Sequence, residues 1–184
     1  MLLSEFLNKY DYKGSIVLLE GKRDVFEDDK QKLYELGKLL CSNSKFILFR
    51  SGNASGEDEC FSNGVVSIDE KRLQVITPYS GHRKKANQSY NTIALDTLNM
   101  LEEPELIYQS KQNDKMGKLI DKYVAGDRDR NAIKAAYILR DTIKVIGTQD
   151  HKAASFGIFY DDLDNPKAGG TGHTIKVCDK NDIP

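Results

Sequence analysis

The sequence predicts an α/β fold in which a parallel sheet carries helices on its faces. Two observations support this prediction. Short apolar runs rich in β-branched residues alternate with longer segments whose apolar residues recur at helical spacing. Glycine-rich turns also separate several of these runs from the helix expected next. The 184 residues suffice for one such domain, and we expect a single domain over residues 1–184.

The first half of the chain has the clearer pattern. We expect it to run strand, helix, strand, helix, strand, with these bounds: Gly14–Gly21, Glu27–Ser44, Lys45–Arg50, Glu57–Asn63 and Lys71–Pro78. Gly64 is expected to end the second of the two helices, since glycine commonly follows the last helical residue.

The second half is less regular, and residues 87–110 predict only weak structure. Beyond them we expect helices over Lys115–Ala125 and Asn131–Arg140, strands over Thr142–Gly147 and Ser155–Tyr160, a loop over residues 161–172, and a helix over His173–Lys180.

Composition disfavours several classes of protein. The formal net charge is -1, so nucleic acid or an acidic membrane exerts no general attraction, although "GHRKK" at Gly81–Lys85 is a local basic patch. No apolar run approaches the length of a membrane span, and no signal peptide is evident. The 3 cysteines lack a CxxC spacing and the histidines lack ligand spacing, so we predict a cytoplasmic protein with reduced cysteines and no metal or cofactor.

Ligands of parallel α/β sheets bind outside the carboxyl ends of the strands, so the loops expected there are the candidates for a site. The first, Glu20–Val25, combines a glycine that lets a ligand approach the backbone with two cations. Its candidate ligand-binding residues are Gly21, Lys22 and Arg23. The alternative is an ordinary strand-to-helix turn with exposed cations.

The second loop lies in "FRSGNASGEDECFSNGV", Phe49–Val65. It offers glycine backbone, hydroxyls and an amide directly before a helix start, where unpaired N–H groups favour a phosphate or carboxylate. The candidates here are Arg50, Ser51, Gly52, Asn53, Gly56 and Asp58. The alternative is an Asn/Gly-rich turn before a capped helix.

The third loop, Ala125–Lys134, places Arg128, Arg130 and Asn131 before a helix, where guanidinium groups could bind phosphate or carboxylate oxygens. A solvated charged turn is the alternative. The fourth segment, "AGGTGHTIKVC" at Ala168–Cys178, again suggests a phosphate-sized glycine nest opening a helix. Its candidates are Gly169, Gly170, Thr171, Gly172 and Thr174.

Taken together, these segments resemble the SLOG superfamily, Rossmann-like proteins related to DNA-processing protein A and to the "lonely guy" phosphoribohydrolases. "RSGNASGEDECFSNGV" resembles the SGGxxGxDxxAHxxA stretch of the former, with Asp58 at the family's aspartate. "DRNAIKAAYILRDTIKVIG" is similar to its RNRIIxxLSxxVVVVEA stretch, and "AGGTGHTIKVC" to the second glycine motif, written SGSxxTA or PGGxGTxxE. The motifs occur in the family's order, and with the first strand they cover most of Ser15–Pro184.

The resemblance implies a Rossmann-like parallel sheet, a groove sized for a nucleotide between the two glycine segments, and Arg130 as a counter-charge. It also implies a further core strand after "DKNDIP", where this sequence stops. One departure concerns chemistry. The lonely guy glutamate that serves glycosidic cleavage has no counterpart in Thr174–Val177, which leaves Glu57 and Glu59 as weak catalytic candidates.

The expectation is therefore a protein that binds a nucleotide or nucleotide-derived small molecule without turning it over. Two alternatives stay open: an N-glycosidase acting on nucleoside monophosphates, and a single-stranded nucleic-acid-binding module, which the net charge does not favour. We expect no membrane partner, and a homo-oligomer is compatible with the sequence.

Overall fold

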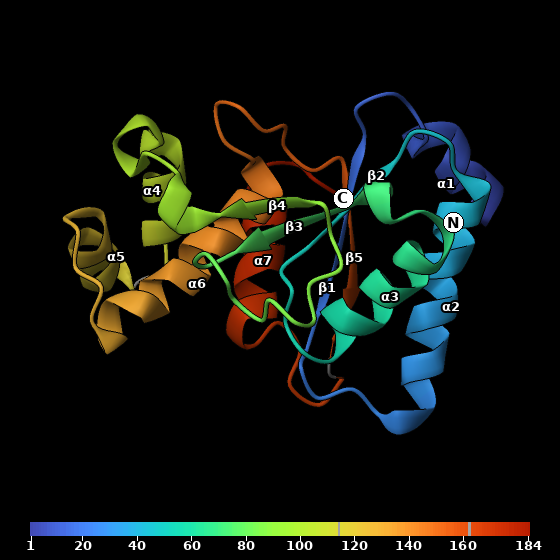
Figure 1. Ribbon diagram of the computed structural model, residues 1–184, viewed down its shortest axis with the longest axis horizontal. Helices are drawn as coiled ribbons and strands as arrows, with labels where there is room; N and C mark the ends of the chain where they lie inside the picture. Colours follow the sequence, from blue (N-terminus) through green and yellow to red (C-terminus); the bar gives the residue numbers. More distant parts are fainter. Residues whose placement is uncertain (114, 162) are drawn as a thin grey trace.

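The computed structural model describes residues 1–113, 115–161 and 163–184, and contains a five-stranded, all-parallel sheet in the order β4-β3-β2-β1-β5. The strands are β1 (Ile16–Gly21), β2 (Leu48–Ser51), β3 (Leu73–Thr77), β4 (Asn91–Ala94) and β5 (Phe156–Tyr160). The chain moves outward from β1 to β4 and then returns to pair β5 with the other side of β1 (Figure 1). The direction of winding therefore switches between β1 and β5.

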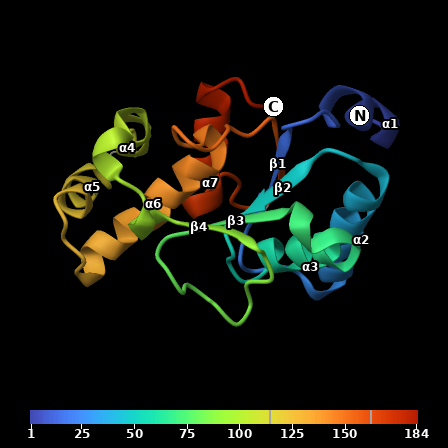
Figure 2. The ribbon, with the colours of Figure 1, turned by 45° about the horizontal axis from the view of Figure 1, so that its top comes forward.

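Helices cover both faces of this sheet, which confirms the expected α/β, Rossmann-like fold. One face packs against α1 (Leu3–Tyr10), α2 (Glu27–Asn43) and α3 (Glu57–Asp69). The other face carries α4 (Pro104–Lys111), α5 (Gly117–Val124), α6 (Arg130–Ile146) and α7 (Gly169–Lys180), as Figures 1 and 2 show. Short 3-10 turns occupy Glu70–Arg72, Leu95–Thr97 and Met100–Glu102.

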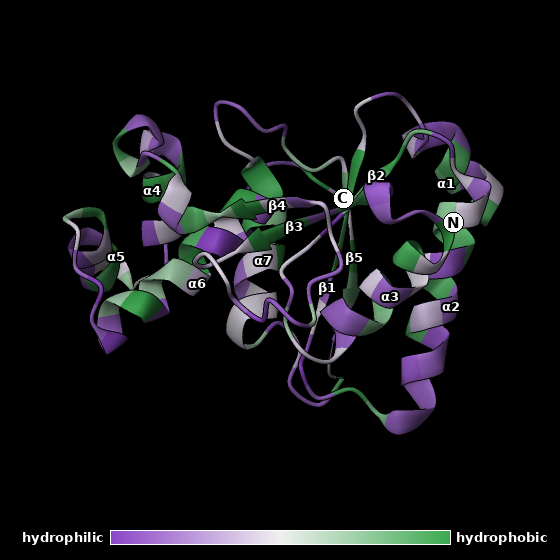
Figure 3. Ribbon diagram, viewed as in Figure 1, coloured by the Kyte–Doolittle hydropathy of each residue, from purple (hydrophilic) through white to green (hydrophobic). Residues whose placement is uncertain are grey.

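Side chains of the central strands alternate between these two faces, as the pleat requires. On the α2/α3 face they are apolar, and Val17, Phe49 and Val75 belong to one core cluster. The α6 face is different, because Glu20, Arg50 and Gln74 lie on it and all three are buried. Figure 3 shows the contrast between the hydrophobic strands and the hydrophilic outer surface of α2. A row of buried polar groups thus lies under α6.

The strand predicted over Thr142–Gly147 is wrong, because these residues form the end of α6 and the C-cap that follows it. Their apolar, β-branched run is typical of a buried strand, but a helix buried on all sides has the same composition. Every residue from Arg140 to Val145 is buried, so this part of α6 lacks the polar stripe that marks a surface helix. The helix predicted over Asn131–Arg140 is the first part of the same 17-residue helix.

Glycine accounts for two further differences. Gly64 does not end α3 but lies inside it. Glycine is needed there because a Cβ would overlap the backbone oxygen of Tyr34 in α2. Likewise α7 begins at Gly169 rather than at His173, so the second glycine segment is the helix's first turn and not a loop. The weak pattern over residues 87–110 contains β4 and α4, and the loop expected over 161–172 includes residue 162, which lies outside the described residues.

Gly64 provides a test of the close packing between α2 and α3. We expect Gly64→Ala to lower the free energy of unfolding by about 1–3 kcal/mol, because overpacking against the backbone outweighs the better helix propensity of alanine. Denaturant unfolding of both proteins measures the difference. Gly117→Ala is the matched control, since a Cβ at Gly117 meets nothing within 4 Å, and its effect should stay within about 0.5 kcal/mol. Equal effects of the two substitutions would contradict this account.

Candidate functional site

The two glycine segments meet against the same part of α6, at the carboxyl edge of the sheet. The backbone oxygen of Gly52 accepts a hydrogen bond from Arg140 Nη1 at 3.0 Å, and a Cβ on Gly52 would lie 3.0 Å from Lys144 Nζ. In α7, a Cβ on Gly170 would lie 3.1 Å from Asp141 Oδ2. Both glycines therefore leave room for charged side chains of α6.

These side chains form a buried ionic network. The fully buried Lys144 contacts Glu20 of β1, and its Nζ lies 2.9 Å from Asp141 Oδ1. The same carboxylate oxygen accepts hydrogen bonds from Arg140 Nε and Nη2 at 3.0 and 2.6 Å. Burial alone would raise the pKa of Asp141, but Arg140 and Lys144 lower it below its usual value.

Carboxyl groups at the start of α3 extend this network. Asp58 Oδ2 accepts hydrogen bonds from the backbone N–H groups of Gly52 and Ala54, both at 3.0 Å, and so fixes the first glycine segment. Both oxygens of Glu57 and Oδ1 of Asp58 are buried without a hydrogen-bond partner when both groups are ionised. Burial, followed by the charge of Asp58 and a hydrogen bond to it, raises the pKa of Glu57 well above its usual value.

The charges balance if Glu57 and Glu20 are both protonated. Arg140 and Lys144 supply two positive charges, and Asp58 and Asp141 supply two negative charges. A proton on one Glu57 oxygen can then be donated to Asp58, which gives two of the three unpartnered oxygens a hydrogen bond. Glu20 is left as the group that titrates near neutrality, because burial raises its pKa to about 7 against the opposing effect of Lys144.

The segment that contains "GHRKK" folds over the first glycine segment. Asn53, with a positive φ of 55°, donates from Nδ2 to the backbone oxygen of His82 at 3.0 Å. Arg83 donates to the Asn53 oxygen at 3.1 Å and to Glu59 at 2.7 Å. The His82 ring stands edge-on to Tyr137 of α6, and burial together with nearby arginines lowers its pKa to about 4. This cover occupies the first segment with protein contacts.

An open pocket of about 740 Å³ lies beside the second glycine segment and runs along α7. Its walls come from one face of α7, from α6 and from the residues that follow α4. Five lysines line it: Lys115, Lys134, Lys167, Lys176 and Lys180. No aspartate or glutamate occurs among the described residues that line it. The first turn of α7 adds the positive end of a helix dipole, so the pocket favours an anion.

Few of these lysines are neutralised by neighbours. Lys167 lies 3.7 Å from Asp179, but both side chains are more than half exposed, so the pair contributes little. Lys180 lies over the Tyr108 ring, 4.5 Å from its centroid. Within the described ranges, no carboxylate lies within salt-bridge distance of Lys134 or Lys176.

Most of the residues predicted from the sequence do lie at this edge of the sheet, but in different surroundings. Lys22, after Gly21, donates from Nζ to the Asn165 oxygen at 2.9 Å and so contacts the segment that leads to α7. Arg23 and Gly56 line a separate pocket at the start of α3. Gly169, Gly170 and Gly172 line the α7 pocket. Three hydroxyl residues, Ser51, Thr171 and Thr174, are instead buried, and Thr174 Oγ1 donates to the Gly170 oxygen.

The residues predicted from the third loop do not line the α7 pocket. These are Arg128, Arg130 and Asn131, which lie at or just before the start of α6. The start of α6 lies beside α5 (Figures 1 and 2), and ten residues of helix, or about 15 Å, separate Arg130 from Arg140, which contacts the first glycine segment. Arg128 donates to the Tyr123 oxygen at 2.8 Å, and the Asn131 N–H donates to the capping carboxylate of Asp129. Arg130 therefore lies far from the part of α6 that contacts the first glycine segment. Lys134, one helical turn further on, lines the pocket beside the second segment, so the role of Arg130 as a counter-charge stays a prediction.

Arg50 and the two glutamates also differ from expectation. The side chain of Arg50 lies under α6 and donates to the backbone of Lys144 and Lys152, so it does not reach the glycine segments. Glu57 is fully buried and Glu59 pairs with Arg83. Neither glutamate faces the α7 pocket.

Sequence reasoning missed the charged residues of α6. Arg140, Asp141 and Lys144 are at positions i, i+1 and i+4, and lie on a helix segment with otherwise apolar neighbours. Charged residues inside an apolar run could have indicated a buried ionic network, since a buried charge needs a partner. The strand assigned to this run concealed it, because alternation would have sent Asp141 and Lys144 to different contacts.

No protein-family model matches the chain, and no curated protein or solved structure shows significant similarity to it. Over the residues that the structure describes, no group of three His, Cys, Asp or Glu side chains is placed to hold a metal ion. The three cysteines are free. No helix in the described ranges is both long enough and apolar enough to span a membrane.

The protonated Glu57 predicts how stability depends on pH. Its pKa is higher in the folded than in the unfolded chain, so its contribution is fully present below about pH 4.5 and is lost as pH rises towards its folded-state pKa. Glu57→Gln supplies an N–H donor to Asp58 that does not titrate. We expect it to raise the free energy of unfolding at pH 8 by about 1–3 kcal/mol and to change it less at pH 5.

Denaturant unfolding at the two pH values measures this effect. Glu59→Gln is the control, because its exposed pair with Arg83 should be worth no more than about 1 kcal/mol at either pH. A Glu57→Gln protein that loses stability equally at pH 5 and pH 8 would show that Glu57 is ionised in the fold.

Proposed function

We propose that this protein binds a nucleotide or a nucleotide-derived small molecule in the pocket along α7, without turning it over. The observation that carries the proposal is the charge of this pocket: five lysines and a helix N-terminus, with no carboxylate among its described lining residues. Like charges gathered around one cavity repel each other, and an anionic ligand relieves that repulsion.

The remaining lining suits the rest of such a ligand. The volume of about 740 Å³ lies within the usual range for small-molecule sites and accommodates a nucleotide. Tyr137 and Met116 offer an aromatic and a thioether surface on which a base can pack, and His173 lies deeper. Phosphate oxygens would be held by lysines and by backbone N–H groups at the start of α7.

The resemblance to the SLOG superfamily supports the same assignment, since the family's second glycine motif corresponds to the first turn of α7. It also indicates why we do not propose cleavage. Where the lonely guy motif continues into its glutamate, this chain has Thr174, Ile175, Lys176 and Val177, and Lys176 lines the pocket. An N-glycosidase needs a carboxyl group beside the ligand.

Isothermal titration calorimetry with AMP, ADP and adenosine tests the proposal. We expect both nucleotides to bind, ADP more tightly than AMP, and adenosine to bind at least about tenfold more weakly because it lacks phosphate. Lys176→Glu should lower nucleotide affinity at least about tenfold, since it removes one charged contact and adds repulsion.

Lys71→Glu is the matched control. It makes the same change of charge at an exposed lysine of the Glu70–Arg72 turn, and should leave affinity within about twofold of wild type. Absence of binding to all three compounds would refute the proposal, as would equal affinities for adenosine and AMP.

A further inference from the structure

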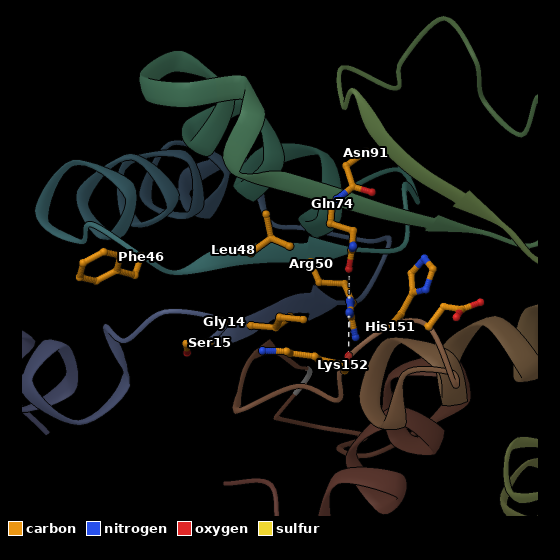
Figure 4. Close-up of a pocket in the computed structure, with 11 residues that line it drawn as sticks. Gly14, Ser15, Phe46, Leu48, Arg50, Gln74, Asn91, His151 and Lys152 are labelled. Carbon is orange, nitrogen blue, oxygen red and sulfur yellow. Dashed lines mark hydrogen bonds between the residues drawn. The ribbon is translucent and has the colours of Figure 1, made fainter.

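A second pocket, of about 350 Å³, lies at the opposite, amino edge of the sheet. Residues at or near the starts of four strands line it, among them Ile16 of β1, Leu48 of β2 and Asn91 of β4. It shares no lining residue with the α7 pocket. Figure 4 shows Arg50 extended across it between Gln74 and Lys152.

Arg50 brings a positive charge to this pocket that no carboxylate balances. Only 1 % of the residue is exposed, and three of its five N–H groups are used, by the Gln74 side chain and by the backbone oxygens of Lys144 and Lys152. No carboxylate of the described chain lies within salt-bridge distance of its guanidinium. Burial alone lowers the pKa of Arg50 to about 10, with no stabilising charge beside it.

A simpler role for Arg50 is to cap the C-terminus of α6, because Lys144 lies in the helix's last turn. A helix end supplies only about half a negative charge, however, and a backbone carbonyl cannot neutralise a guanidinium. Capping also leaves two N–H groups of Arg50 without a partner. It therefore explains the position of the side chain but not its charge balance.

Two more polar groups without partners line the same pocket. The Ser15 hydroxyl is fully buried and has no hydrogen-bond partner. Lys152 is exposed, and its ammonium lies against Gly14, has no acidic neighbour within salt-bridge distance in the described ranges, and in Figure 4 is directed towards Gly14 and Ser15. Asp150 is the only acidic residue among the described lining residues, and it is exposed and forms no salt bridge within the described chain. Two cations, one hydroxyl and the exposed carboxylate of Asp150 thus surround this space.

We propose that the amino-edge pocket binds a small organic carboxylate. The carboxylate would accept hydrogen bonds from Arg50, Lys152 and Ser15, three donors that the protein leaves unused in whole or in part. The body of the ligand would pack on the apolar part of the lining, formed by Ile16, Phe46 and Leu48. The volume limits the ligand to about the size of an aromatic acid, smaller than a nucleotide.

Benzoate and inorganic phosphate, titrated calorimetrically at low ionic strength, are the probes. We expect benzoate to bind at least about fivefold more tightly than phosphate, because only benzoate uses the apolar wall. Lys152→Met should weaken benzoate binding at least about tenfold. Ser15→Ala should weaken it about threefold, and should not destabilise the free protein because the lost hydroxyl has no partner.

Two controls separate this site from the α7 pocket. Lys71→Met, at an exposed lysine elsewhere, should leave benzoate affinity unchanged, and so should Lys176→Glu, which disrupts the α7 pocket. Benzoate binding that is lost in Lys176→Glu but retained in Lys152→Met would place the probe in the α7 pocket and overturn the proposal. No benzoate binding, or equal affinities for benzoate and phosphate, would also overturn it.

Discussion

The buried contact between Lys144 and Glu20 is the constraint on which the arrangement of this fold depends. It fixes α6 against β1, an interior strand of the sheet, and a charge left buried without its partner costs several kcal/mol. Rotating α6 by one residue would move Lys144 away from Glu20 and Arg140 away from the Gly52 oxygen. The ionic network therefore specifies the orientation of α6, which an apolar interface would define less strictly.

The same network explains why glycine is required in the first segment. Gly52 has room for no side chain because Arg140, Lys144 and Asp58 already occupy the space around it. A glycine that predicts access for a ligand can thus serve the packing of charged side chains instead. Gly169 and Gly170 differ, since both line the open α7 pocket. Gly56 of the first segment lines only the separate pocket at the start of α3, so only the second segment offers its backbone to a ligand in the α7 pocket.

The sequence was sufficient to predict the fold class, because β1, β2, β3 and β5 have short apolar runs and α2 has clear helical spacing. It was insufficient for α6, whose buried half has the composition of a strand. It also concealed α7's first turn, since three glycines have low helix propensity and only tertiary packing makes them helical. For the site, the edge of the sheet was predictable, but the five lysines come from separate elements and meet only in the folded chain.

Asp141 explains why lysines, rather than a glycine nest alone, would have to hold the proposed ligand. Its carboxylate lies close to Gly170, where it already interacts favourably with the N-terminus of α7. An incoming phosphate would meet this negative charge, although Arg140 and Lys144 neutralise much of it. The attraction must therefore come from groups farther along the pocket, and Lys134 and Lys176 are placed there without carboxylate partners among the described residues. On this argument, Lys176 would supply charge to the proposed anion site from beyond the first turn of α7.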